Sequence, residues 1–198
     1  MSVLEFCEYK EIIKDRMSKK RYIHSLNVAK AAEHLAKKYG ADVKKAKTAG
    51  ILHDITKETP YDQQLQIIKS NGIMLNSIQE ISPKTWHAIS GCLYVEKNLG
   101  ITDKDILNAI RYHTSGRAGM SLLEKVIFVA DFVGDERDYN GVEIMRAKAE
   151  RSLEEAMLYG VSFSIQDLTS HQCAVDINTF ALYNELIINQ NKDNKDRK

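Results

Sequence analysis

Apolar residues recur at helical spacing along nearly the whole chain. No stretch of the sequence alternates apolar and polar residues between hairpin turns, so the pattern predicts an all-α fold. Capping residues and breaks divide the chain into expected helices over residues 4–17, 18–39, 42–52, 59–72, 83–100, 102–113, 121–133, 142–159 and 170–189. We expect residues 1–190 to form a single helical domain.

Local signals mark the ends of several expected helices. Ser18 and Gly40 bracket the second one, and Ser121 with Glu124 forms a capping box ahead of the apolar run 126–133. Residues 191–198 contain no apolar side chain. We therefore expect the end of the chain to be a polar, disordered tail.

The composition of the 198-residue chain is that of an ordinary globular protein, with 43% hydrophobic and 28% charged residues. The 28 basic and 27 acidic side chains leave a formal net charge of +1. This balance gives no overall attraction for nucleic acid or an anionic membrane, so we expect neither as a partner. Acidic residues near the start argue against a signal peptide, and no apolar run approaches the ~20 residues of a membrane span.

The three cysteines of the chain, Cys7, Cys92 and Cys173, lie far apart and form no CxxC pair. The pattern therefore indicates neither a disulfide framework nor a thiolate zinc site. We expect a reduced, cytoplasmic protein.

Four of the six histidines fall on the inward faces of different expected helices: His24, His53, His87 and His113. His34 shares its face with lysines and His171 lies in a polar stretch, so both are expected to face solvent. A single inward histidine is most often a hydrogen-bonded core residue. Four of them on separate helices make that explanation much weaker.

Asp131 lies inside the apolar run 126–133, with Ile127 and Phe128 one turn earlier on its own face. An ionised carboxylate in such a place costs several kcal/mol unless it is paired. A salt bridge to a buried cation, or protonation of the acid, would explain it without any ligand. The alternative, which we favour, is a bound metal cation.

Asp54 directly follows His53, so the two side chains can approach one centre from adjacent directions. The sequence thus offers six candidate metal ligands: His24, His53, Asp54, His87, His113 and Asp131. One tetrahedral catalytic metal takes three protein ligands, so six donors fit two ions that share a carboxylate better. Imidazole and carboxylate donors without thiolates favour iron, manganese or zinc.

The order His24, His53-Asp54, Asp131 resembles the HD-domain metal-dependent phosphohydrolase superfamily, and the added His87 and His113 resemble its subgroup with two metals. Local sequence is similar to the YqeK-like symmetrical hydrolases of diadenosine tetraphosphate over roughly residues 5–190. The matching segments are Arg-Tyr-Ile-His-Ser at 21–25, Gly-Ile-Leu-His-Asp-Ile-Thr-Lys at 50–57, His-Thr-Ser-Gly at 113–116, Leu-Glu-Lys-Val-Ile-Phe-Val-Ala-Asp at 123–131, Arg137, and Gly-Val-Glu at 141–143.

One departure from that family is visible after Asp131. The family commonly has Glu-Pro there, where this chain has Gly134-Asp135. If the family's glutamate shapes the pocket, Asp135 or Glu136 would have to take its place, or the substrate would be placed differently.

The resemblance implies a single-domain HD-type helical bundle. It further implies that His24, His53, Asp54 and Asp131 hold one metal, and that Asp54 bridges to a second metal held by His87 and His113. The implied metal is iron, the implied enzyme a symmetrical bis(5'-nucleosyl)-tetraphosphatase, and the implied assembly a homodimer. A metal pair lowers the pKa of bound water to about 7, so a metal-bridging hydroxide would cleave the tetraphosphate to two ADP.

Candidate phosphate contacts surround these ligands. Lys57 lies three residues after Asp54 and Arg137 follows Asp131 in a polar loop, so we expect both to join Asp54 as catalytic residues. The remaining candidate substrate contacts are Arg21 and the loop residues Thr114, Ser115, Gly116 and Arg117. Each has a structural alternative, because Gly116 can end a helix, Arg21 can pair with an acid, and the other cations can be solvated.

Three further functions stay open at this stage. The chain could act on another nucleotide, such as a nucleoside monophosphate, a cyclic dinucleotide or an alarmone, or it could be an oxygen-activating di-iron enzyme. It could also be a non-enzymatic, nucleotide-binding module whose metal only stabilises the fold. Product analysis, dioxygen dependence and metal-dependent turnover would distinguish these alternatives.

Overall fold

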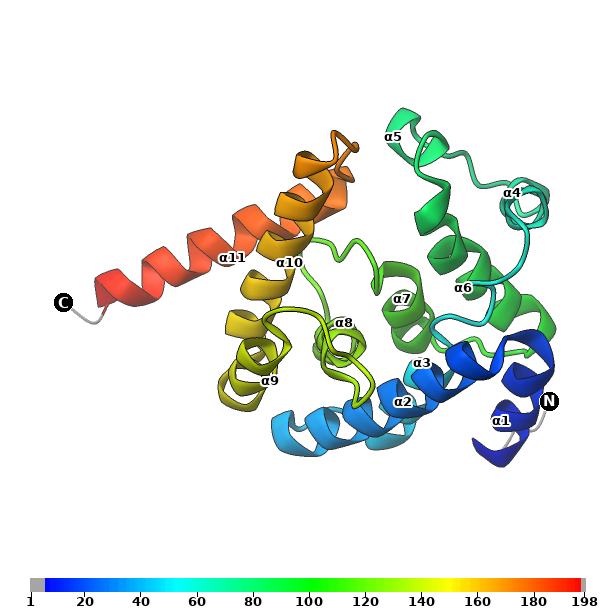
Figure 1. Ribbon diagram of the computed structural model, residues 1–198, viewed down its shortest axis with the longest axis horizontal. Coiled ribbons are helices and arrows are strands. Elements are labelled where there is room, and N and C mark those ends of the chain that lie inside the picture. The colour runs from blue at the N-terminus through cyan, green and yellow to red at the C-terminus, as the bar shows by residue number, and fades with distance from the viewer. Residues whose placement is uncertain (1–5, 197–198) are drawn as a thin grey trace.

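The computed structural model describes residues 6–196, which form eleven α-helices, one short 3-10 helix and no strand (Figure 1). The helices are α1 (Phe6–Arg16), α2 (Lys19–Tyr39), α3 (Val43–Leu52), α4 (Tyr61–Ser70), α5 (Ser77–Glu80), η1 (Pro83–Thr85), α6 (Trp86–Asn98), α7 (Lys104–Tyr112), α8 (Leu122–Val133), α9 (Val142–Arg151), α10 (Leu153–Ser170) and α11 (Ile177–Asp196). The prediction of an all-α fold is confirmed.

Several predicted helix ends coincide with caps in the structure. The Ser18 hydroxyl accepts the Arg21 backbone N–H at the start of α2, and Gly40 ends that helix in the left-handed conformation with φ of 79°. At the start of α8, Ser121 and Glu124 make both bonds of a capping box. These ends are fixed locally, so they could be predicted from neighbouring residues alone.

Other boundaries differ from the prediction. The helix expected over 142–159 is two helices, because Ser152 is extended and caps α10 by accepting the Glu155 N–H. A short helix, α5, precedes Pro83, and Pro83 itself opens the 3-10 turn η1 before α6 begins. The last helix, expected over 170–189, instead runs from Ile177 to Asp196.

The end of the chain therefore continues α11 beyond the expected helix end at Asn189 into the segment that we expected to be a disordered tail. Residues 197–198 of that segment lie outside the described residues. The division into a domain of residues 1–190 and a tail of residues 191–198 stays a prediction.

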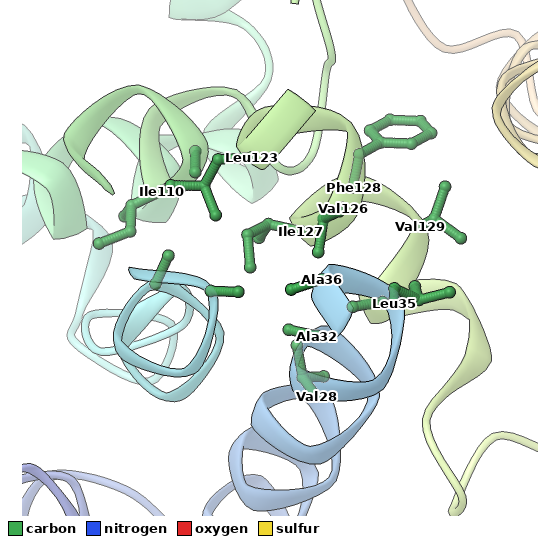
Figure 2. Close-up of a cluster of buried hydrophobic side chains, with 14 of the residues drawn as sticks. Val28, Ala32, Leu35, Ala36, Ile110, Leu123, Val126, Ile127, Phe128 and Val129 are labelled. Carbon is green, nitrogen blue, oxygen red and sulfur yellow. The ribbon is translucent and has the colours of Figure 1, made fainter. Parts of the chain in front are cut away.

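Helix α8 is the centre of the core, with α2, α3, α7, α9 and α10 packed around it. The buried α8 side chains meet α2 and α7, as Figure 2 shows for Ile127 beside Ala36 and for Leu123 beside Ile110. α8 is apolar on most sides and its residues from Val126 to Ala130 are buried, and the polar Asp131 lies in its last turn.

The packing of α2 against α3 is tight because Gly50 lies at their contact. A Cβ at this position would be 2.9 Å from Ala29 Cα and 3.3 Å from Ala32 Cβ, both in α2. Small residues on both sides let the two backbones approach closely. This close approach positions the end of α3, where His53 and Asp54 lie, beside α2.

The periphery of the fold contains α10 and α11, which pack on each other, and α11 extends away from the other helices toward the C-terminus (Figure 1). A second, smaller apolar cluster joins α4 to α6 through Ile68, Trp86, Ile89 and Leu93. Among the described helices, none combines the length and the apolar character that crossing a bilayer requires.

Candidate metal centre

All six predicted metal ligands converge on one buried region. His24 lies in the second turn of α2, and His53 and Asp54 directly follow α3. His87 is the second residue of α6, His113 directly follows α7, and Asp131 is in the last turn of α8. The four imidazoles and Asp54 are buried, and the Asp131 side chain is 21% exposed. The predicted inward orientation of the four histidines is confirmed, while His34 and His171 are exposed as expected.

The first group of donors contains His24, His53 and Asp131. His24 Nε2 is 3.1 Å from Asp131 Oδ1 and 3.2 Å from His53 Nε2, and His53 Nε2 is 3.8 Å from the same carboxylate oxygen. One ligand atom from each residue can therefore face a common ion. Two imidazoles and a carboxylate, from α2, α8 and the end of α3, make this a candidate metal position.

A second group of donors lies beside the first, around Asp54. Asp54 Oδ1 is 3.2 Å from His87 Nε2 and 3.6 Å from His113 Nε2, and these two ring nitrogens are 3.2 Å apart. The other oxygen, Asp54 Oδ2, is 3.6 Å from His24 Nε2 and 3.4 Å from His53 Nε2. Each oxygen of Asp54 thus faces one histidine pair, which is the arrangement that a shared ligand between two ions requires.

The tautomers of the histidines fit metal binding. Nδ1 of His53, His87 and His113 contacts the carbonyl oxygen of Gly50, Lys84 and Ile110, at 2.7, 2.9 and 2.8 Å respectively. A carbonyl can only accept, so each Nδ1 donates its hydrogen and leaves Nε2 for a metal. The donor set therefore fits one or two transition-metal ions, as the metal-dependent HD domains require.

The two carboxylates are kept ionised by their neighbours. Burial alone would raise the pKa of Asp54, but the imidazoles of His53, His113 and His87 hold that pKa well below its usual value. The pKa of Asp131 is also held well below its usual value, because the hydrogen bond to His24 and the charges of His53 and Arg137 outweigh burial. Burial lowers the pKa of His87 to about 4, so its ring is neutral at physiological pH.

The predicted cations reach the same region. Arg21 Nη1 is 2.7 Å from Asp54 Oδ2, and Arg137 pairs with the Asp131 carboxylate while its Nε donates to the Asp131 carbonyl at 2.8 Å. Lys57 Nζ lies 3.2 Å from His87 Nε2, and burial lowers the pKa of this lysine. The structure thus brings Arg21, Lys57 and Arg137 to the donors. Arg21 makes the acid pairing that was the alternative to a phosphate contact, and the Arg137 pair is the salt bridge that was the alternative to a metal at Asp131.

The loop after His113 has structural partners of its own. The Arg117 guanidinium makes two bonds to the buried Glu124 carboxylate, Nε to Oε1 at 2.6 Å and Nη2 to Oε2 at 2.9 Å. Gly116 has φ of +61°, and a Cβ there would collide with Leu182 of α11. The Ser115 hydroxyl donates to the Gly116 carbonyl. Gly116 thus ends the helical turn after α7, as its structural alternative stated, and Arg117 is directed to Glu124. A phosphate contact from this loop, including Thr114, stays a prediction.

One site residue was left undecided by the sequence. Glu136 contacts His24 Nδ1 through Oε1, and its Oε2 accepts from Asn27 Nδ2 at 2.7 Å. Asp135 points elsewhere, to Lys30 Nζ at 2.8 Å, and both of these side chains are largely exposed. Glu136 rather than Asp135 is therefore the acid that enters the centre after Asp131.

Comparisons with known proteins agree with this geometry. The model of the HD domain family matches residues 21–133. The chain is 40% identical to the symmetrical bis(5'-nucleosyl)-tetraphosphatase of Bacillus subtilis over 88% of this chain and 94% of that protein. It is 36% identical to the protein of the same name from Halalkalibacterium halodurans over 91% and 96% of the two chains.

A solved structure also resembles the whole fold. The crystal structure of a predicted HD superfamily hydrolase involved in NAD metabolism from Clostridium acetobutylicum superposes with a TM-score of 0.92 at 32% identity, covering 95% of this chain and 100% of that one. The expected resemblance is confirmed by sequence and by structure. The chain belongs to the HD-domain family and, within it, to the family of proteins named symmetrical bis(5'-nucleosyl)-tetraphosphatase.

Proposed function

We propose that this chain is a metal-dependent hydrolase that cleaves diadenosine tetraphosphate symmetrically into two ADP. The observation that carries the proposal is the convergence of four imidazoles on the two oxygens of Asp54, with cationic side chains beside them. The relatives named symmetrical bis(5'-nucleosyl)-tetraphosphatase support the choice of substrate, because they align over nearly their full length.

The metal-ligand set is part of this proposal. His24, His53 and Asp131 would hold one ion, His87 and His113 would hold the other, and Asp54 would contribute to both. Two bound ions would act as Lewis acids on phosphate oxygens and would lower the pKa of water. We propose iron as the metal; the same imidazole and carboxylate donors also suit manganese and zinc.

The cations of the site match the charge of the substrate. A tetraphosphate bridge carries about four negative charges at neutral pH, which need partners beyond the metals. Arg21 and Arg137 hold carboxylates of the site yet remain 28% and 34% exposed, so both guanidinium groups can reach an incoming phosphate. Lys57 lies against the His87 ring, and a nearby phosphate would favour its charged form.

Symmetrical hydrolysis breaks the central bridge of the tetraphosphate. Water adds to one inner phosphorus, the bond from that phosphorus to the bridging oxygen breaks, and the departing ADP keeps the oxygen. The leaving group is a diphosphate whose last pKa, near that of a phosphate ester at ~6, makes it a good leaving group without a strong general acid. Positioning and charge neutralisation are then the main tasks of Arg21, Lys57 and Arg137.

The decisive experiment is anaerobic purification, metal counting, and product analysis with diadenosine tetraphosphate. We expect two metal ions per chain and ADP as the sole product. Equal amounts of ATP and AMP would refute symmetrical cleavage. Faster turnover of a nucleoside monophosphate, a cyclic dinucleotide or an alarmone would show that this other nucleotide is the substrate. Strict dependence on dioxygen would indicate a di-iron oxygenase. Inactivity of the metal-loaded protein would favour a binding module.

Two variants test the ligand assignment. Asp54→Ala should lose metal and activity together, because it removes the oxygens that face both histidine pairs. His34→Ala is the matched control, since its ring lies on the surface and pairs with Glu150. The assignment is wrong if His34→Ala proves as damaging as His24→Ala.

A cytoplasmic location and a homodimeric assembly belong to the same proposal. The three cysteines are free thiols in the structure, which agrees with a reducing compartment. Sedimentation of the purified protein would establish the number of chains in the assembly.

A further inference from the structure

The four imidazoles of the metal centre differ in what holds their Nδ1 atoms. For His53, His87 and His113 the partner is a neutral backbone carbonyl three residues earlier in the chain. For His24 the partner is the carboxylate of Glu136, which lies 112 positions away in the sequence. His24 is therefore the one imidazole of the four with an anionic partner at Nδ1.

The position of each histidine in its helix explains this difference. His53 and His113 directly follow α3 and α7, where the last carbonyls of a helix have no intrahelical partner and can accept from a ring. His87 lies at the start of α6 and uses a carbonyl of the preceding turn η1. His24 lies inside α2, where the carbonyls already accept backbone N–H groups, so its partner has to come from another element.

The Glu136 carboxylate is held firmly in its place. Asn27, three residues after His24 on the same face of α2, donates to its second oxygen at 2.7 Å. A Cβ on Gly134 would lie 2.8 Å from that oxygen, so the carboxylate is packed directly against the Gly134 backbone. Arg146 Nη2 then fixes the loop from α9 by donating to the carbonyls of Gly134 and Arg137 at 2.9 and 3.0 Å.

We infer that Glu136 is a positioning residue that holds His24 with Nδ1 protonated and makes the His24–His53–Asp131 position the tighter of two metal positions. An anionic partner at Nδ1 fixes the ring and raises the basicity of the ligating nitrogen. At Nδ1, His87 and His113 have backbone carbonyls, and His87 Nδ1 also lies 3.3 Å from Lys57 Nζ, so neither ring has an anionic partner there. The inference rests on the proposed metal-ligand set.

The experiment compares Glu136→Ala and Glu136→Gln with the wild-type chain by titrating metal-free protein with Mn²⁺ against a chelator. For wild type we expect two affinities. Glu136→Ala should weaken the tighter one about 10- to 100-fold and leave the other unchanged, and Glu136→Gln should weaken it less, because its amide oxygen still accepts from Nδ1. Asp135→Ala is the matched control, since this neighbouring carboxylate pairs with the exposed Lys30.

A second readout needs no metal. Nitrogen NMR of the histidine rings in the metal-free protein at alkaline pH should show His24 with hydrogen on Nδ1 in wild type and Asp135→Ala. In Glu136→Ala the hydrogen should move to Nε2, because the Asp131 carboxylate, 3.1 Å from that nitrogen, then accepts it without competition from Glu136. Gly134→Ala, which keeps the glutamate but crowds its carboxylate, should change the tautomer and the affinity in the same direction.

Two results would overturn the inference: equal weakening of both metal affinities in Glu136→Ala, or an unchanged His24 tautomer in that variant. A wild-type chain that binds no metal would refute the proposed function instead, and the tautomer measurement would still decide whether Glu136 positions His24. Circular dichroism of each variant excludes loss of fold as the cause.

Discussion

Replacing Gly50 with alanine should separate the two helices that carry three of the six donors. The new Cβ would lie 2.9 Å from Ala29 Cα and 3.2 Å from Ala29 N, and these are backbone atoms that cannot rotate away. An ordinary contact between carbon atoms begins near ~3.5 Å, so α2 and α3 have to move apart by roughly 0.6 Å. That shift would displace His24 relative to His53 and Asp54.

The expected effect on stability is small. Overpacking of a core costs about 1–3 kcal/mol, whereas alanine is favoured over glycine inside a helix by about 1 kcal/mol. The free energy of unfolding should therefore fall by about 0–2 kcal/mol, which lowers Tm by at most about 8 °C in a chain of this size. Metal binding should suffer more, because His24 Nε2 and His53 Nε2 are only 3.2 Å apart. A 1 Å misplacement of a catalytic group can lower a reaction rate about 100-fold, which shows how sensitive such sites are to position. For the smaller shift here we expect roughly tenfold weaker metal binding.

Thermal denaturation and metal competition on the same preparation would test this prediction. Gly160→Ala in α10 is the control, because its Cβ would meet only side-chain tips, Met145 Cε and Phe132 Cε2, both at 3.3 Å. The control should keep the metal affinity of wild type. Wild-type metal affinity in Gly50→Ala would show that the distance between α2 and α3 does not set the geometry of the donors.

Two further predictions concern side chains outside the donor set. Arg117→Ala should lower the free energy of unfolding by about 1–3 kcal/mol, because the buried Glu124 carboxylate loses its bidentate partner. The KM for the substrate should stay unchanged. A higher KM at unchanged stability would instead establish Arg117 as a phosphate contact. Burial raises the pKa of Cys92 to about 11, so this thiol should resist a maleimide at neutral pH while the exposed Cys7 and Cys173 react. Mass spectrometry should count two labelled thiols in the native protein and three after unfolding, and rapid native labelling of Cys92 would contradict its raised pKa.

Much of the donor set could be predicted because each donor is defined by its own helix. The apolar neighbours of His24 and His113 at helical spacing indicate which face turns inward, and that face needs no knowledge of the rest of the fold. Asp131 is conspicuous because its surroundings in α8 are apolar. Convergence of the donors on one region then follows from packing several such faces into one core.

Contacts between distant segments could not be predicted in the same way. The pairing of Glu136 with His24 depends on how the loop after α8 returns to α2, and no local pattern encodes that return. Arg117 shows a partner that lies nearby in the sequence yet was not foreseen, since its guanidinium pairs with Glu124 seven positions away.

Helix boundaries were missed where periodicity outweighed a local signal. Ser152 with Glu155 three residues later is a capping pattern, yet the amphipathic pattern of 142–159 runs through it without interruption. α5 has only four residues between its caps, which is too short for any period to emerge. In both places the capping residues were a better guide than the hydrophobic pattern.

The pairs that Arg21 and Arg137 make with Asp54 and Asp131 also bear on how the protein matures. Buried acids without counter-charges would oppose the collapse of the chain, and such a protein would depend on metal to fold. Here the opposing charges come from the polypeptide itself. We therefore expect the chain to fold without metal, so that metal can bind to a donor set that is already assembled.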